Sequence, residues 1–336
     1  MRTYLLPEGG TLYKANLHCH TDISDGKLTP EAVKEWYKSN GYSIVCYTDH
    51  EVMIDHRDLC DDEFLALHGY EVAIKQHLDR HTAFFMPVYH FNFIAENQND
   101  LRMPRFFKDN PSMPGNARRW AEEQGVYDPS DIIDTVKYDI DWLNDYLCAV
   151  RDAGFLVTYN HPQWSLQTAK DYLGLQGLHA IEAMNGGCRF LNDNTSLHFE
   201  QMLRAGMQVV PVGGDDNHCS QDHGHAWTMI KAEALTYDAV IKAYKNGDCY
   251  ASEGPSITDL YIEDGEVVVK CSPCVSACLL SEGRASSVRQ DTNGNLVEAR
   301  FPYKPAAFGS FFRIELKDAA GKRAFSAAYK TADITI

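Results

Sequence analysis

The sequence predicts an α/β protein in two parts, a parallel barrel over residues 1–254 and a small all-β, sandwich-like domain over residues 255–336. Two observations support this class. From residue 13 to about residue 250, apolar runs of strand length alternate with helical patterns, as in parallel barrels. After Pro255 the chain changes to short alternating runs separated by turn signals, a pattern typical of small β domains. Nothing in this second part predicts a catalytic site.

Seven apolar runs are expected to form the strands of the first part. They cover residues 13–20, 42–50, 64–73, 81–89, 155–161, 179–185 and 208–213. The spacing between several of them leaves room for a helix, which a parallel connection requires. The carboxyl ends of parallel barrel strands converge on one face, so the residues that end these runs are expected to meet there.

The helices between the strands have recognisable ends. Thr29 is a predicted N-cap, with Pro30 at the first helical position and a glycine closing the helix. A longer pattern runs from Ile132 to Val150 with apolar residues three and four apart, and we expect it to pack on the outside of the barrel. Two further helical patterns, each ending in a glycine, cover residues 194–206 and 236–247.

Residues 95–130 interrupt the alternation with a segment rich in Asn, Asp, Pro, Met and basic residues. A long insertion in a compact domain is usually functional or mobile. We therefore expect an inserted loop or lid near the mouth of the barrel. A solvated surface excursion fits the same composition equally well.

Composition and charge exclude several classes of partner. The chain has 336 residues, 44% of them hydrophobic, which is enough for one large core and a smaller domain. Its formal net charge of −16 argues against a nucleic-acid polymer or an anionic membrane as the main partner, because like charges repel. Bound cations would reverse that sign locally. The composition leaves the oligomeric state open.

The first ten residues lack the long apolar segment of a secretory signal, and no stretch reaches the length of a membrane span. We therefore expect a cytoplasmic protein, although a signal peptide removed before this start would leave the same sequence. The ten cysteines are scattered, which favours reduced, buried thiols. Cys271, Cys274 and Cys278 form one cluster that suits a zinc or redox site. Without a second Cys or His pair nearby, buried thiols are the preferred interpretation.

Candidate metal ligands stand at or just beyond the ends of the predicted strands. His18 and His20 are alternate residues, so a strand would point both imidazoles to one side. Imidazoles and carboxylates without cysteine favour zinc, manganese or iron over calcium or magnesium. The set is His18, His20, Asp25, His50, Glu71, His81, His161, Asp216 and His218. Nine donors are too many for one ion, and two or three ions bridged by Glu71 would use them.

Five motifs in this set resemble the PHP family, named for polymerase and histidinol phosphatase domains. The resemblance covers roughly residues 12–252. The motifs are His18-x-His20-Thr21-x-x-Ser24-Asp25-Gly26, Thr48-Asp49-His50, Gly69-x-Glu71, His161-Pro162 and Gly214-Asp215-Asp216-x-His218. Asp215 stands where the family more often has Ser or Thr, and the Asp-x-His spacing selects Asp216 as the ligand.

The resemblance implies a distorted (β/α)7 barrel with a centre of two or three divalent transition-metal ions, Mn, Zn or Fe, that hydrolyses phosphate esters. One ion would be held by His18, His20, Glu71 and Asp216, a second by Asp25, His50 and His218, and a third by Glu71, His81 and His161. His77 lies four residues before His81, but His81 opens an apolar run as the family's ligand does. Glu71, Asp216 and His218 are the expected catalytic residues.

The expected reaction is hydrolysis of a small phosphate monoester, of the nucleotide or sugar phosphate class, by a metal-bridged hydroxide. No base-stacking platform or long basic groove is recognisable in the sequence, so a nucleic-acid polymer is not the expected substrate. Arg189 and Asn185, after the sixth apolar run, are the candidate substrate-binding residues. Arg189 is equally suited to pair with a surface acid, and Asn185 to satisfy loop backbone.

Two alternatives remain at the level of the sequence. The same metal cluster could act on an amide or a lactone, because an activated hydroxide does not choose between carbon and phosphorus. A catalytically silent module that binds metal only for its structure is the other. The complete ligand set argues against the silent module.

Overall fold

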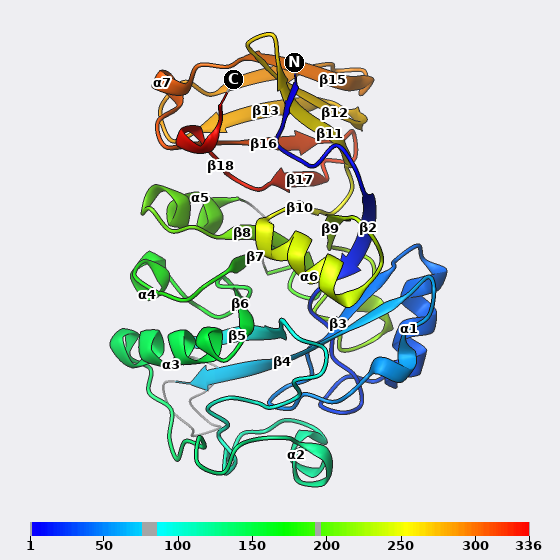
Figure 1. Ribbon diagram of the computed structural model, residues 1–336, viewed down its shortest axis with the longest axis vertical. Coiled ribbons are helices and arrows are strands. Elements are labelled where there is room, and N and C mark those ends of the chain that lie inside the picture. The colour runs from blue at the N-terminus through cyan, green and yellow to red at the C-terminus, as the bar shows by residue number, and fades with distance from the viewer. Residues whose placement is uncertain (1, 76–85, 192–195, 336) are drawn as a thin grey trace.

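The computed structural model describes residues 2–75, 86–191 and 196–335 (Figure 1). It contains a fourteen-stranded sheet and a second sheet of four strands, with helices against the larger one. The predicted α/β class is confirmed. In Figure 1 the four-stranded sheet lies at the top with both chain ends beside it, and α2 lies at the opposite end.

The first strands of the large sheet come in chain order. They are β2 (Thr11–Asn16), β3 (Ile44–Tyr47), β4 (Leu65–Lys75), β5 (Val88–Ala95), β6 (Phe155–Tyr159), β7 (Ala180–Asn185) and β8 (Val210–Gly214). The ladders β2–β3, β3–β4, β6–β7 and β7–β8 are parallel, as predicted. The order of strands in the sheet ends at β8. Asn217, just after β8, forms an isolated parallel bridge with Cys19, which lies just after β2.

The expectation of an all-parallel arrangement is wrong for β5. Lys75 pairs with Val88, so the chain turns back after β4 and β5 runs antiparallel both to β4 and to β6. The strand also begins at Val88, later than the predicted run over 81–89. Its alternate residues Phe91 and Phe93 pack in the main hydrophobic core.

The helices follow the predicted caps closely. Thr29 accepts a hydrogen bond from the backbone N–H of Ala32 at 3.3 Å and begins α1 (Pro30–Ser39). The long helix begins later than the periodicity suggested, because the Asp139 side chain caps it by accepting from Trp142 N at 3.0 Å. The remaining helices of this part are α2 (Ala117–Gln124), α3 (Ile140–Asp152), α4 (Ala169–Tyr172), α5 (Leu197–Arg204) and α6 (Tyr237–Asn246), with 3-10 turns at Arg57–Leu59 and Ser220–Asp222.

Residues 95–130 pack against the body of the protein. Met103, Phe106 and Met113 are buried in the main core, which distinguishes the segment from a solvated excursion. At Gly115 (φ +54°) a Cβ atom would lie 1.8 Å from the backbone oxygen of Ser24, so this contact requires glycine. The next residue donates its N–H to the same oxygen at 2.8 Å. The segment therefore lies against the loop that carries Asp25, and its role as a lid stays a prediction.

Strands of the second part, together with β1 (Arg2–Tyr4), β9 (Trp227–Ala232) and β10 (Cys249–Ser252) from the first, form two facing sheets. β1, β11 (Ile257–Glu263), β12 (Glu266–Cys274) and β15 (Leu296–Pro302) make the four-stranded sheet. From β2 the large sheet continues through β9, β10, β17 (Arg323–Ser326), β16 (Phe311–Lys317), β13 (Ser276–Ser281) and β14 (Ser287–Gln290). The short strand β18 (Tyr329–Lys330) pairs with β16. This part of the chain also contains a short helix, α7 (Pro305–Phe308), and a 3-10 turn at Thr331–Asp333. Leu260 and Val267 from one sheet and Leu279 and Ile314 from the other share one core. The boundary at residue 254 stays a prediction.

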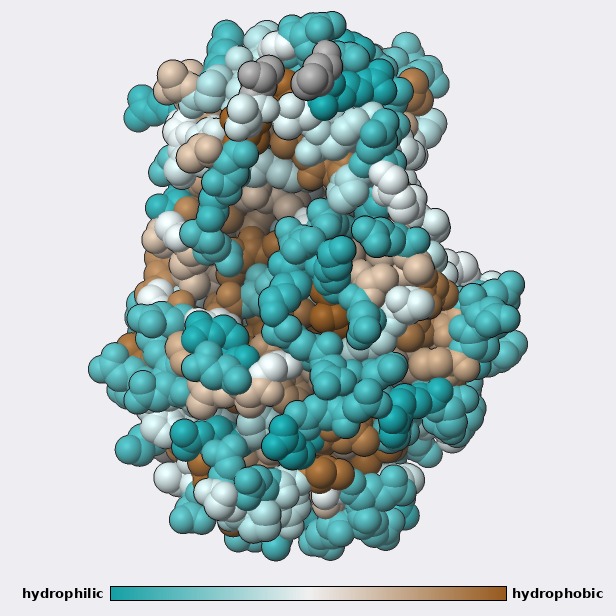
Figure 2. Space-filling view, in the orientation of Figure 1, coloured by the Kyte–Doolittle hydropathy of each residue, from teal (hydrophilic) through white to brown (hydrophobic). Residues whose placement is uncertain are grey.

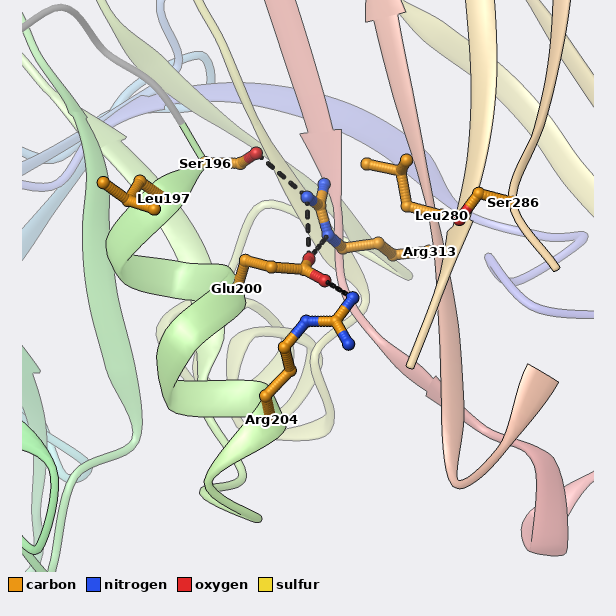
Figure 3. A pocket seen from close by; sticks show the side chains of 7 residues that line it. All are labelled: Ser196, Leu197, Glu200, Arg204, Leu280, Ser286 and Arg313. Carbon is orange, nitrogen blue, oxygen red and sulfur yellow. Dashed lines mark hydrogen bonds and ion pairs between the residues drawn. The ribbon is translucent and has the colours of Figure 1, made fainter. Parts of the chain in front are cut away.

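Helix α5 is joined to β16 by a buried charge network (Figure 3). The Arg313 side chain, 1% exposed, donates from Nε and lies within 3.0 Å of Glu200 Oε2, and its Nη2 donates to Ser196 Oγ at 2.9 Å. Arg204 contacts the other oxygen of Glu200 at 2.6 Å. The network lines a hollow of about 530 Å³ between α5 and the strands.

Hydrophilic side chains cover most of the face seen in Figure 2, with hydrophobic ones gathered between the upper sheets and the body of the molecule. Among residues 2–75, 86–191 and 196–335, no helix is long and apolar enough to cross a membrane.

Candidate metal centre

The side chains of the centre come from the ends of several strands. His18 and His20 follow β2, His50 follows β3 and is bridged to Glu71 in β4, and His161 follows β6. All five are buried, with at most 8% exposure. Because strand ends meet at one face of the sheet, residues distant in sequence are brought within contact of one another.

Glu71 is the most connected acid in this cluster. Its Oε1 lies 3.3 Å from His18 Nε2 and 3.0 Å from His90 Nδ1. Its Oε2 lies 3.1 Å from His50 Nδ1 and 3.4 Å from His20 Nε2. Because imidazoles lie close to both of its oxygens, the Glu71 carboxylate has the position expected of a group that bridges two ions.

Asp216 is the second shared acid. Its Oδ1 lies 3.0 Å from His20 Nε2 and 3.3 Å from His18 Nε2, and its Oδ2 lies 3.8 Å from His161 Nε2. The neighbouring Asp215 points elsewhere: it accepts from Tyr37 OH at 2.9 Å and from three backbone N–H groups of residues 224–226. The structure thus brings Asp216, and not Asp215, into the cluster.

Four groups have ligand atoms within 4.8 Å of one another, close enough to share an ion. They are His20, Asp25, His50 and His218; His18, His161 and Asp216; His18, His20 and Glu71; and His50, Glu71 and His90. Eight of the nine candidate ligands therefore lie together. The ninth, His81, lies outside the described residues.

His90 belongs to the cluster but is absent from the set of ligands predicted from the sequence. It lies on β5, where it pairs with Ala73, diagonal to Glu71 across the ladder. The signal was present in the alternation of His90 and Asn92 with the two core phenylalanines, which puts both polar residues on the other face of the strand. The predicted run over 81–89 stopped one residue short of it.

Further buried groups orient the histidines. Glu182 in β7 accepts from His18 Nδ1 at 2.9 Å, and because a carboxylate only accepts, this fixes the hydrogen on Nδ1 and leaves Nε2 facing the cluster. Ser165 Oγ lies 3.1 Å from His161 Nδ1. Asn160 donates to Glu71 Oε1 at 2.8 Å. Such partners are typical of metal-binding histidines and carboxylates.

The two candidate substrate-binding residues have protein partners. Asn185 is buried and donates to Glu182 Oε2 at 2.8 Å and to Asp216 Oδ2 at 3.2 Å. Arg189 donates to the backbone oxygens of Gly186 (2.7 Å) and Gln221 (3.1 Å), which joins two loops at this face. Their contacts with substrate stay predictions.

Burial and neighbouring acids act in opposite directions on the histidines of the cluster: burial dominates at His50 and lowers its pKa to about 3. Burial alone would lower the pKa of His20, but Asp216 and Glu71 outweigh it and raise that pKa to about 10. Burial alone would raise the pKa of Glu71, yet the surrounding histidines, His90 and His18 foremost, hold it well below its ordinary value. Ionised acids surrounded by imidazole nitrogens form a donor set that suits divalent metal ions.

Two residues of the centre hold strained backbone conformations. His161 has φ +23° and Asp216 has φ +49°, in a region that residues other than glycine rarely occupy. Each such residue costs of order 1–3 kcal/mol and persists where the surrounding structure fixes it. Here the strain accompanies side chains directed into the cluster.

No protein-family model and no curated protein matches this sequence. Among solved structures, the chain matches a two-domain protein containing a predicted PHP-like metal-dependent phosphoesterase from Bacteroides vulgatus, with 15% identity, 97% of each chain covered and a TM-score of 0.46. The chain is similar to PHP-like phosphoesterases. The description of this neighbour names the same family as the motif resemblance does.

Two other matches have different descriptions. One is an amidohydrolase from Chromobacterium violaceum with bound sulfate, at 16% identity, covering 70% of this chain and 96% of that one, with a TM-score of 0.42. The other is the lesion-specific endonuclease PfuEndoQ from Pyrococcus furiosus, at 13% identity, covering 70% of this chain and 56% of that one, with a TM-score of 0.41. Overlaps of this size assign no role to any residue of this chain, so its chemistry follows from its own side chains.

Proposed function

We propose that this protein is a metal-dependent phosphoesterase that hydrolyses small phosphate monoesters. The convergence of buried imidazoles on two shared acids, Glu71 and Asp216, is the observation that supports it most. We propose two or three divalent ions, Mn, Zn or Fe, as cofactors, because the donors are nitrogen and oxygen atoms without thiolate. A distorted seven-stranded barrel closed near the Cys19–Asn217 bridge is the proposed frame.

The donor groups divide among three proposed positions. His18, His20, Glu71 and Asp216 would hold one ion. Asp25, His50 and His218, joined by His20, would hold a second. Glu71, His90 and His161 would hold a third, since His90 Nδ1 and His161 Nε2 lie 3.0 and 3.4 Å from Glu71 Oε1. When bound, such ions supply an activated water, neutralise phosphate charge and stabilise the leaving oxygen.

The chain's own residues contribute orientation and exclusion of water. Glu182 keeps the Nε2 lone pair of His18 directed into the centre. Ser165 Oγ, 3.1 Å from His161 Nδ1, holds the orientation of the His161 ring. Asn185 holds Asp216 from the other side, which limits the rotation of that carboxylate. The burial of these groups keeps bulk water away from the reacting phosphate.

A small substrate fits the charge of the molecule better than a polymer does. With a net charge of −16, the surface as a whole repels a polyanion, so attraction is confined to the metal centre. A single phosphate group can be held by the ions themselves. The further phosphates of a nucleic acid would require basic residues along their path.

Hydrolysis of p-nitrophenyl phosphate tests this proposal. We expect turnover by protein loaded with Mn²⁺ or Zn²⁺, its loss on chelation, and its loss in His18→Ala. His179→Gln is the matched control, because His179 is a histidine at the opposite end of β7, bonded to the Tyr244 carbonyl and outside the centre. Hydrolysis of a lactone or amide by loaded protein that cleaves no phosphate ester would overturn the proposal in favour of the carbon-centred reaction.

A further inference from the structure

Trp164 has a position unlike that of the other tryptophans. Of the five in the chain, the other four belong to or pack against hydrophobic core clusters, namely Trp36, Trp120, Trp142 and Trp227. Trp164 belongs to no core cluster of the described residues and is 42% exposed. A tryptophan that contributes nothing to the core and faces solvent is available for a ligand.

This exposed ring lies directly beside the metal centre. Its centroid is 5.0 Å from the His161 ring, in an edge-on arrangement, and 5.4 Å from the His90 ring. Both histidines contact Glu71. The ester group of a phosphate held by the centre would therefore lie next to the Trp164 ring.

The loop that carries Trp164 holds it in place. Ser165 N donates to the His161 backbone oxygen at 3.1 Å, and Leu166 N donates to Gln163 O at 3.1 Å. Ser165 O accepts from Val88 N at 3.2 Å, which ties the loop to the start of β5. The same serine contacts His161 Nδ1, so one residue positions both the histidine and the neighbouring indole. A surface ordered before binding loses little entropy when a ligand stacks on it.

Several exposed apolar side chains lie in this loop and in the segments that follow it in the sequence. The described chain has ten large hydrophobic residues that are exposed, and six of them lie between residues 164 and 197: Trp164, Leu166, Leu173, Phe190, Leu191 and Leu197. Trp164 and Leu166 follow β6, and Phe190 and Leu191 follow β7, the strands whose carboxyl ends lead to His161 and Asn185. Leu197 lines the hollow between α5 and the strands instead. Apolar surface concentrated next to a polar centre indicates a ligand with an apolar part.

We propose that Trp164 is the stacking platform for the alcohol part of the substrate, and that the substrate is a phosphate ester whose alcohol carries a flat face. A heteroaromatic base and the apolar face of a sugar ring both have this chemistry. The inference rests on the proposed phosphoesterase function and adds the leaving-group class. It also supplies the stacking surface that the sequence alone did not reveal.

Primary alkyl phosphates that differ only in a flat group test the platform. Benzyl phosphate and ethyl phosphate both release primary alkoxides, so the chemical step is matched. We expect Trp164→Ala to lower kcat/KM for benzyl phosphate by about 10- to 100-fold, the range expected for a lost stacking contact, and to change ethyl phosphate less than about threefold. Trp164→Phe should recover most of the loss. Val297→Ala, an exposed apolar residue of β15 that lies outside this surface, is the control.

Two further esters of primary alcohols, adenosine 5′-monophosphate and glucose 6-phosphate, test whether the flat group of the substrate is a heteroaromatic base or a sugar ring. Whichever ester loses more kcat/KM in Trp164→Ala identifies a base or a sugar. An equal loss for all four esters would show that Trp164 only supports the centre, and no loss for any would show that it is idle. Either result overturns the inference while leaving the phosphoesterase function intact.

Binding separates the two proposals if no ester is turned over. Benzylphosphonate and ethylphosphonate are not hydrolysed, and calorimetry on metal-loaded protein measures their affinities directly. We expect benzylphosphonate to bind at least tenfold more tightly, with the advantage lost in Trp164→Ala. Equal affinities for the wild type would overturn the platform regardless of activity. Absence of turnover with the advantage retained would count against the phosphoesterase function alone.

Discussion

Glu182 shows how a single buried acid can act through a neighbouring histidine. It accepts from His18 Nδ1 at 2.9 Å and from Asn185 Nδ2 at 2.8 Å, and its side chain is almost fully buried. One oxygen thus sets the tautomer of a proposed ligand, and the other fixes a residue that holds Asp216. Groups of this kind control metal affinity without touching the metal.

Glu182→Gln is therefore expected to weaken metal binding by about 10- to 100-fold, because the neutral amide is a poorer acceptor for His18 Nδ1. Competition with a chelator of known affinity measures the change. Glu31→Gln, in the first turn of α1, is the control with the same chemical change on the surface. Unchanged affinity in Glu182→Gln would show that the tautomer of His18 is set by other contacts.

His179 gives a prediction for stability against pH. Burial lowers its pKa from the ordinary 6.5 to about 4, and the accepting carbonyl of Tyr244 offsets only part of this. Between pH 6.5 and 4 the unfolded chain binds a proton that the folded chain does not. Stability therefore falls as the pH is lowered through this window, by up to about 1.4 kcal/mol per pH unit, and is unaffected above it.

Urea unfolding of the wild type and His179→Gln at pH 7.5, 6.0 and 5.0 measures this contribution. Glutamine keeps a donor for Tyr244 O but does not titrate. We expect the difference in unfolding free energy between the two proteins to shift in favour of the variant as the pH falls. A constant difference across the range would contradict the burial argument, and the comparison cancels titration elsewhere.

At the level of single residues, the sequence was informative where chemistry and strand position agree. His18, His20 and Asp216 were found because motif spacing and strand ends point to the same place. His90 was missed because its predicted strand ended at residue 89, and a shift of one residue exchanges the two faces of a strand. Trp164 was not found because nothing in the sequence separates an exposed tryptophan from the four core ones.

Among the elements, α5 is joined to β16 by charge as well as by packing, since Arg313 also lies over the Phe199 ring. Arg313 is 1% exposed and faces Glu200 at 3.0 Å, with Glu315 3.4 Å from its Nη1. A buried pair of this kind contributes little net stability, but loss of one partner leaves a charge without its counterion. The network therefore acts mainly to fix where α5 lies.

Glu200→Ala is expected to lower the free energy of unfolding by about 3 kcal/mol, since Arg313 stays buried with Glu315 as its remaining acid. Arg313→Met combined with Glu200→Ala should recover much of that loss, because no buried charge is left behind. Arg204→Ala, which removes the exposed contact to the same acid, should cost less than about 1 kcal/mol. Equal losses in all three variants would contradict a buried-charge origin.

Whether a segment forms a helix or a strand was largely predictable from its periodicity. Whether a strand runs parallel or antiparallel to its neighbours was less predictable. Capping by Thr29 and the glycine after α6 are local signals that the structure reproduces. The start of α3 was misplaced because Val136 and Ile133 pack against the core without being helical, so their spacing imitated a helix. The reversal of β5 depends on its pairing with Lys75, a contact that no local pattern encodes.

For the molecule as a whole, the metal ions are expected to act as counterions for a strongly acidic chain. Ligands that bind only the folded state stabilise it, by about 2.7 kcal/mol when their concentration is a hundred times the dissociation constant. We therefore expect chelation to lower Tm by several degrees, and added Mn²⁺ or Zn²⁺ to restore it. Calorimetry with His18→Ala as the control checks this: a variant that keeps the full metal-dependent shift would contradict the proposed centre.

The fold class followed from the alternation of apolar runs and helices, which local residues determine. The arrangement of the second region did not, because β1 belongs to the four-stranded sheet although it opens the chain. Arg2 pairs with Glu263 and Tyr4 with Tyr261, a contact between segments that share no pattern. Pairings across such sequence distances are set by the assembled sheet rather than by either segment.

This pairing has a consequence for how the protein is made. While the chain is being synthesised, Arg2–Tyr4 has no partner strand until β11 emerges, more than 250 residues later. Strand β1 therefore stays unpaired while the residues between it and β11 are synthesised and begin to fold. The four-stranded sheet is completed only after β12 and β15 have also been synthesised, so it forms later than the strands that carry the metal centre can pair.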